Sequence, residues 1–339
     1  MTYRTPHLRV IGPGSDDMLT TWGSKLIGVR LIDRLDGESD EAIFRFTRKK
    51  PYMEIPPQGT PYTVQAGWSA QGMALFGRYT FQRVHIFGEP KQGQQLHLIC
   101  RAADFNDDLK KVDSQHFDKE NGHSTLGDMF NSLFKSSGSR VLIHPDIASI
   151  PVPDGYALRW RETALDFAMG IAENVGAVVK PMDGKILILK RGSLQSVSGQ
   201  DLPVIQMQFD ENYSFDVERE PKYEYQEVSA SYLDTDKGTL EQEKQSSGKQ
   251  GAADALPHPF SGSDGAKRAA AAAAVELAGA TGQGLFTKVG DPAATAGARV
   301  ACSGFGTPID ETTWEAECVT HEIVPTVGWT TTVETRVVD

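Results

Sequence analysis

Three short motifs in this sequence come close to known catalytic or ligand-binding patterns, and each lacks a required residue. His321-Glu322 begins like the zinc motif H-E-x-x-H, but Pro325 occupies the place of the second histidine, within a strand-like run. Residues 67–71 (GWSAQ) approach the nucleophile turn G-x-S-x-G without its final glycine. Residues 12–14 (GPG) lack the third glycine and the following helix of a dinucleotide loop. We therefore expect no catalytic residue, metal or cofactor at these places.

A fourth candidate is the acidic stretch 104–120, which holds enough carboxylates for a glycosidase pair or a Ca²⁺ site. It lacks the spacing of a calcium loop, and lysines at 110, 111 and 119 are interleaved with the acids. A solvated loop face is the simpler interpretation. The absence of a credible catalytic set favours a structural protein.

Charge and composition narrow the class further. The 34 Lys and Arg against 45 Asp and Glu give a net charge of −11, which speaks against a binder of nucleic acid through its phosphates. The three cysteines, an odd number without C-x-x-C spacing, indicate buried thiols rather than disulfides or zinc. No apolar run approaches the ~18 residues of a membrane span, and the N-terminus lacks a signal-peptide core, so we expect a protein made in the cytoplasm that does not insert into membranes.

The first hundred residues read as strands separated by turns. The predicted strands alternate apolar and polar residues and are broken by Gly, Pro and Asp-Gly signals every ~8–12 residues, a pattern typical of a sandwich or barrel. They are expected at 8–11, 26–35, 42–47, 62–68, 79–87 and 96–102.

The middle of the chain changes period and predicts a small α+β unit. Ser124-Thr125 with Asp128 looks like a capped helix start, followed by apolar residues at helical spacing as far as position 134. A second helix is expected from Thr163, with an apolar stripe at 165, 169, 172 and 175 and a closing glycine at 176. Two extended runs flank Asp183-Gly184 and form the strongest hairpin signal in the sequence.

The last part is expected to be β again, interrupted by one long excursion. Residues 234–264 hold few large apolar side chains and predict a long loop. The Ala-rich run 265–280 predicts a helix with almost no side-chain bulk. Strands are expected at 204–209, 223–232, 298–302, 313–324 and 330–338.

Three stretches together resemble the phage late control D family, the baseplate hub proteins of contractile tails in phages and R-type bacteriocins. The first leads from 77–79 (GRY) to Arg101 and Asp104. The second contains 125–129 (TLGDM), the helix 162–177 and the hairpin with Asp183, Gly184 and 185–187 (KIL). The third is the closing stretch, with His321, Gly328, Trp329, Thr331 and Glu334. Each motif alone is loose, whereas their common order covers most of the chain.

The resemblance implies a β-rich α+β fold with two tail-tube-like β-barrel domains flanking a small α+β insert. The expected domains are 1–104, 105–196 and 197–339, the last carrying the loop and helix of 234–280. It also implies a homotrimer whose six barrels form a pseudo-sixfold ring between a hexameric tail-tube protein and a trimeric central spike protein. Wedge, sheath-initiator and tape-measure proteins are further candidate partners in the baseplate of the virion or bacteriocin particle.

For such a ring we predict interface residues on two strands and on the Ala-rich helix. They are Tyr79, Phe81, Val84, Val300, Lys267, Ala271 and Ala274. Packing within the chain is an equal alternative for the helix, and Trp329 and His321 fit a core position better than a ligand site. Two other functions stay open, a tail-associated cell-wall hydrolase and a free-standing β-rich binding protein.

Overall fold

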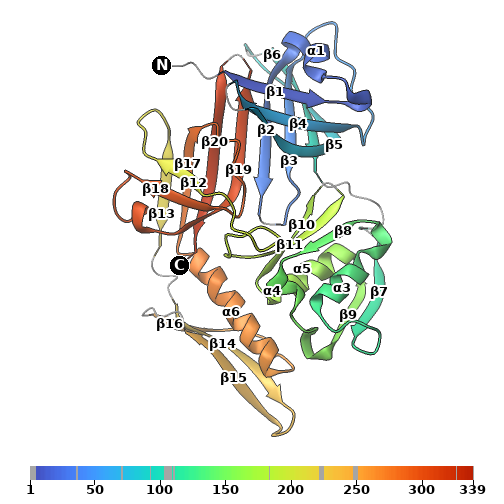
Figure 1. The fold of residues 1–339 in the computed structure, drawn as a ribbon, viewed down its shortest axis with the longest axis vertical. Coiled ribbons are helices and arrows are strands. Elements are labelled where there is room, and N and C mark those ends of the chain that lie inside the picture. Colours follow the sequence, from blue (N-terminus) through green and yellow to red (C-terminus); the bar gives the residue numbers. More distant parts are fainter. Residues whose placement is uncertain are drawn as a thin grey trace.

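The computed structural model describes residues 5–35, 37–69, 72–91, 93–102, 109, 111–182, 184–220, 225–246, 251–325 and 327–338 (Figure 1). Asp104 and Asp183 lie outside these ranges. The fold is β-rich α+β, as the alternation of the sequence predicts. Two β units form the upper part of Figure 1, a compact α+β unit lies below the first, and a small sheet with one long helix lies below the second.

A single large sheet runs through both β units. Its order is β1-β4-β5-β6-β3-β2-β19-β20-β17-β13, and β18 joins the start of β19 to β12. The strands are β1 (Pro6–Ile11), β2 (Leu26–Arg34), β3 (Glu41–Thr47), β4 (Pro61–Trp68), β5 (Gly72–Glu89), β6 (Gly93–Arg101), β12 (Ile205–Gln208), β13 (Phe215–Arg219), β17 (Gly282–Val289), β18 (Arg299–Ser303), β19 (Trp314–Val324) and β20 (Gly328–Val337).

The two β units meet where β2 pairs with β19. The pairing is antiparallel and sets Leu31 opposite His321 and Arg30 opposite Glu322. Among the described residues no pairing closes either unit on itself, because the sheet path ends at β1 and at β13. The predicted strands of both units are present, whereas β13 and β17 were not expected from the sequence.

Each β unit has its own apolar core on one face of this sheet. In the first, Trp22 of α1 (Met18–Trp22) packs with Phe44, Phe46 and Tyr62 at centroid distances of 5.0, 5.1 and 5.7 Å. In the second, Trp314 and Phe286 lie at the centre. Of the three free cysteines, two are buried and Cys302 is half-buried.

The α+β unit begins and ends its helices where the sequence predicts. Thr125 caps α3 (Leu126–Leu133), and its capping box with Asp128 is complete. Thr163 caps α5 (Ala164–Asn174) by accepting the backbone N–H of Asp166. The remaining elements are β7 (Asp113–Asp118), β8 (Arg140–Ile143), α4 (Pro145–Ala148), β9 (Tyr156–Glu162), β10 (Ala177–Met182) and β11 (Lys185–Lys190).

One detail of α5 differs from the prediction. Its buried face holds Ala164, Phe167, Ala168 and Ala172, whereas Met169 is 40% exposed. The buried stripe of the helix therefore lies about one residue away from the expected one. The hairpin of β10 and β11 pairs Met182 with Lys185, and Gly184 takes a left-handed φ of 69°.

Three strands and one helix form a folded module within residues 225–279, which we call the excursion. The prediction of a long loop over 234–264 is therefore wrong for most of that stretch. β14 (Tyr225–Asp234) pairs with β15 (Thr239–Ser246) and with β16 (Ala252–Ala255), and α6 (Ser263–Gly279) covers this sheet. Its core is small, with Ala230 of β14 against Ala266 and Ala270 of α6. The polar composition of this stretch predicts a loop, but β15 is a strand with one face exposed to solvent, and such a strand can hold many polar residues. No described helix is long and apolar enough to cross a membrane.

Candidate functional site

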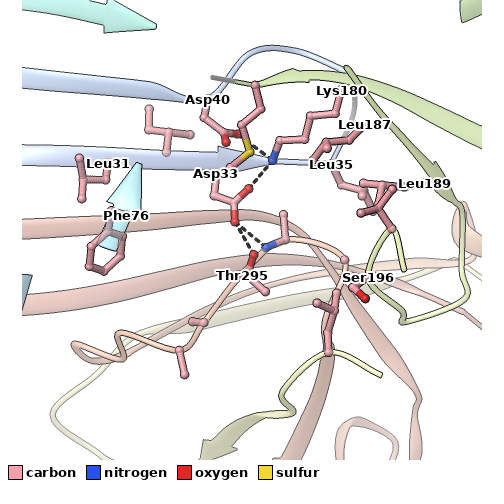
Figure 2. A pocket seen from close by; sticks show the side chains of 18 of the residues that line it. Leu31, Asp33, Leu35, Asp40, Phe76, Lys180, Leu187, Leu189, Ser196 and Thr295 are labelled. Carbon is pink, nitrogen blue, oxygen red and sulfur yellow. Dashed lines mark hydrogen bonds and ion pairs between the residues drawn. The ribbon is translucent and has the colours of Figure 1, made fainter. Parts of the chain in front are cut away.

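The first β unit, the α+β unit and the second β unit meet at a buried cluster of charges (Figure 2). Lys180 of β10 reaches the carboxylate of Asp33 on β2, with an Nζ–Oδ1 distance of 2.5 Å. The same ammonium group lies 2.8 Å from Oδ1 of Asp40, which precedes β3. The other oxygen of Asp33 accepts the hydroxyl of Thr295 at 2.7 Å and the backbone N–H of Ala296 at 2.9 Å. One carboxylate therefore contacts all three units.

The charge states of this cluster follow from burial and pairing. Burial raises the pKa of Asp40 to about 6, and the neighbouring charge of Asp33 adds to that rise. Burial opposes ionisation of Asp33 as well, but Lys180 and the hydrogen bonds from the Thr295 loop hold its pKa below the ordinary value. For Lys180 burial acts against the charged form, and the two carboxylates outweigh it and raise the pKa. Near neutral pH the ammonium is therefore charged and paired.

A cavity of about 350 Å³ adjoins this cluster. Its walls are mostly apolar, with Leu31, Leu187 and Leu189 among the side chains labelled in Figure 2. It is lined by all three units, so its shape depends on their relative placement. Within the described residues no group of three or more His, Cys, Asp or Glu is placed to hold a metal ion.

An aromatic cluster lies beside the cavity and joins the two β units. Trp68 of β4 stacks on Trp329 of β20 at a centroid distance of 5.2 Å, and Phe76 of β5 meets His321 edge-on at 4.8 Å. The indole N–H of Trp68 donates to the carbonyl of Gly290 at 2.9 Å. Gly290 has no room for a side chain, because a Cβ there would come within 2.3 Å of Trp329.

His321 is a core residue of this cluster and is neutral. Its Nδ1 lies 2.9 Å from the hydroxyl of Thr331 and 3.4 Å from the indole N–H of Trp329. An indole nitrogen only donates, so Nδ1 is the acceptor and the proton sits on Nε2. Burial lowers the pKa of His321 to about 4, although the charge of Asp33 acts in the opposite direction.

A second set of ion pairs ties α6 to the second β unit. Arg336 of β20 donates to Glu315 of β19 at 2.6 and 2.9 Å, and both side chains are buried. The other carboxylate oxygen of Glu315 accepts the backbone N–H of Gly192, which follows β11. Glu276 of α6 pairs with Arg191 and lies 3.8 Å from the guanidinium of Arg336. The excursion is thus connected to both neighbouring units through charge.

The opposite face of the large sheet carries polar and charged side chains. On its middle strands lie threonines such as Thr320, and Glu322 pairs there with Arg30 at 2.9 Å and with Arg45. Towards β13 the face becomes acidic, and four carboxylates line a shallow hollow of about 200 Å³: Asp216, Glu218, Glu317 and Glu334. Towards β5 it carries Arg83, His85 and His97 beside Arg30 and Arg45.

The predicted interface residues fall into two groups. Tyr79, Phe81 and Val300 are buried in this chain's own cores, which leaves their side chains no surface for a neighbouring chain. Val84 of β5 is half-buried. On α6 Lys267 is exposed, and Ala271 and Ala274 are half-buried. The inward face of α6 packs on β14, so intramolecular packing, which the sequence left open, accounts for that face.

The motif residues of the closing stretch gather at the joint of the two β units. His321 and Trp329 belong to the aromatic cluster, and the hydroxyl of Thr331 is hydrogen-bonded to His321. Gly328 opens β20, and Glu334 lies on the opposite, acidic face. Arg101 pairs with Glu41 across β6 and β3 at 3.0 Å. Sequence reasoning missed Asp33 and Lys180. A lysine between Val179 and Pro181 in an otherwise apolar run was the available signal.

The curated proteins that this chain resembles in sequence come from phages. No family model matches the chain. The "Probable baseplate hub protein" of Escherichia phage 186 is 25% identical over 191 residues, which are 56% of this chain and 46% of that protein. The chain thus matches about half the length of this curated relative.

Two solved structures share the fold over nearly the whole chain. The 43 kDa tail protein of prophage MuSo2 from Shewanella oneidensis matches with a TM-score of 0.70, 12% identity and 98% coverage of both chains. The tail protein from Neisseria meningitidis MC58 matches with a TM-score of 0.68, 14% identity and coverage of 98% of this chain and 96% of that chain. By sequence the chain is similar to a phage baseplate hub protein, and its fold is that of the two tail proteins.

Proposed function

We propose that this chain is the structural baseplate hub of a phage-type contractile tail or a related injection machine, and that it acts as a homotrimer. Its sequence likeness to a phage baseplate hub protein and its fold likeness to phage tail proteins support this assignment. The role is mechanical rather than enzymatic, and the particle is assembled in the bacterial cytoplasm.

The observation that carries the proposal is the single sheet through both β units, which is antiparallel except where β12 pairs with β18. Eight of its strands, from β5 to β13, follow one another in alternating directions. One face packs on the two cores, and the other is polar. A sheet of this kind can line the wall of a ring whose remaining strands come from sister chains, which would give each β unit the tube-like barrel wall that it lacks alone.

In this proposal residues 1–104 and 197–339 supply two similar positions in the ring, and residues 105–196 lie outside it. Three copies then present six β units to a hexameric tail-tube protein and three equivalent surfaces to a trimeric spike protein. The Asp33–Lys180–Asp40 cluster would keep the two β units and the α+β unit at fixed angles under load. Wedge, sheath-initiator and tape-measure proteins are further proposed neighbours.

Sedimentation velocity on the purified chain tests the proposal, together with negative-stain electron microscopy. We expect a trimer and ring-shaped particles with threefold symmetry. A strict monomer over the whole accessible concentration range, without rings, would contradict the hub. Peptidoglycan zone clearing by the wild-type chain, abolished by one Asp or Glu substitution, would instead support a cell-wall hydrolase.

A further inference from the structure

We propose that neighbouring copies of this chain join by pairing the open edge of β5 with the open edge of β13, and that opposite charges on the two strands face each other across this seam. The inference rests on the proposed trimer and names the strands and side chains that hold it. The basic residues are Arg83 and His85 on β5, and the acidic residues are Asp216 and Glu218 on β13.

Both strands have an edge without a backbone partner in the described part of the chain. β5 pairs with β4 only as far as Thr80, and the backbone of Phe81 still bonds to Gly59 and Thr60. Beyond Phe81 its sole strand partner among the described residues is β6. β13 pairs with β17 and with no other described strand. Open strand edges of this kind bind further strands.

The directions of the two edge strands suit a head-to-tail contact. All neighbouring pairs from β5 to β13 are antiparallel. With eight strands on this path, β5 and β13 therefore run in opposite directions. A second copy placed edge to edge in the same orientation continues the alternation, and a repeat of one such contact closes into a ring when the rotation between copies is a third of a turn, as in the proposed trimer.

The charges on the polar face are complementary at the two edges. Arg83 is paired across the sheet with Ile99 and His85 with His97, on the face that also carries Arg30 and Arg45. Asp216 is paired with Leu285 on the same face of the sheet, beside the acidic hollow. All four of these seam side chains are exposed. Neither Arg83 nor Asp216 has an ion pair within the residues that the structure describes.

The opposite face of each edge strand offers an apolar side chain. Ile86 of β5 is 42% exposed and Phe215 of β13 is 44% exposed, although both lie on the core side of the sheet. Phe215 is the outer member of an aromatic group with Phe209 and Phe305, at 6.0 and 5.1 Å. Edge-to-edge pairing would therefore extend both cores across the seam while it joins the charges on the other face.

The same charges exclude wrong contacts. Pairing of two β13 edges would set carboxylates against carboxylates, and pairing of two β5 edges would set Arg83 against a like charge. Like charges across an interface disfavour such complexes strongly. The seam thus selects the head-to-tail contact that a ring requires.

Charge reversal tests the seam on the full-length chain. We expect the double variant Asp216→Arg/Glu218→Arg, and separately Arg83→Glu/His85→Glu, to raise the apparent dissociation constant of the trimer more than about tenfold in sedimentation velocity. The quadruple variant, in which both sides are reversed, should recover the trimer. Asp236→Arg/Glu120→Arg makes the same change in net charge as Asp216→Arg/Glu218→Arg, at exposed sites away from the seam, and should leave assembly unchanged.

The outcomes separate the seam from the proposed function. A wild-type trimer that both double variants preserve would overturn the seam and leave the hub standing. Loss of the trimer in both double variants without recovery in the quadruple variant would also overturn the charge pairing. A wild-type chain that is strictly monomeric would overturn the hub and, with it, the seam.

Discussion

The junction of the three units and the excursion that carries α6 are held together in different ways. At the junction large aromatic rings and buried charges converge, with Trp329 stacked on Trp68 and Lys180 between two carboxylates. In the excursion the core consists of alanines, and polar strands face the solvent. The comparison indicates that one region fixes relative orientation, whereas the other is a lightly packed module whose helix also contacts α5 and β20.

The largest effect is expected from Lys180→Met. The substitution leaves the carboxylates of Asp33 and Asp40 buried without their cation, which should cost about 3–5 kcal/mol of unfolding free energy. Urea unfolding measures the loss. Lys190→Met, which removes the exposed pair with Asp146, is the matched control and should change less than about 1 kcal/mol. Equal losses of unfolding free energy in the two variants would show that the buried cluster stabilises the protein no more than an exposed ion pair does.

A pH-dependent effect is expected from His321. Its folded pKa of about 4 lies below the ordinary value of 6.5, so the unfolded chain takes up the proton first. The stability that its neutral form contributes is complete above pH 6.5 and is lost as the pH falls towards 4, by about 3 kcal/mol. His321→Gln should remove this part of the pH dependence.

The control for this experiment is the difference between wild type and variant at each pH. Asp40, with its pKa raised to about 6, acts in the opposite sense, since its protonated form is favoured in the folded state. That contribution is common to both proteins and cancels in the difference. A wild-type curve parallel to that of His321→Gln between pH 7 and 4 would contradict the neutral buried histidine.

A smaller and local effect is expected from Ala270→Leu. The added volume meets β14 where Ala270 packs against Ala230, which should cost about 1–3 kcal/mol. Hydrogen exchange should rise in β14, β15 and α6 and stay unchanged in β2 and β19. Lys267→Leu on the exposed side of the same helix is the control. A rise in exchange throughout the chain would show that the excursion unfolds only together with the junction.

The smallest effect is expected from Lys244→Gln. Lys244 pairs with Glu227 across β15 and β14 at 2.7 Å, but both side chains are partly exposed. Its loss should change the midpoint of thermal unfolding by the equivalent of less than about 1 kcal/mol, and added salt should reduce the difference further. A loss comparable to that of Lys180→Met would mean that surface charge, rather than packing, holds the excursion.

Sequence reasoning succeeded where a signal is local. The helix caps at Thr125 and Thr163 and the turn at Gly184 are each decided by residues within a few positions of one another. It failed for β15, because a strand with one exposed face and charged cross-strand partners needs few apolar residues. It also failed for the contact of Lys180 with Asp33, since these residues are 147 positions apart and only the assembled fold brings them together.

The pairing of β2 with β19 has a consequence for the order in which the chain folds. Arg30 and Glu322, which pair across these strands, are 292 positions apart. During synthesis β2 emerges long before its partner exists, so its edge stays open until β19 has left the ribosome. Contacts of such long separation form slowly, and an open edge is prone to pair with other chains in the meantime. The first β unit thus depends on a strand made almost 300 residues later, and a chain truncated before β19 would keep that edge exposed.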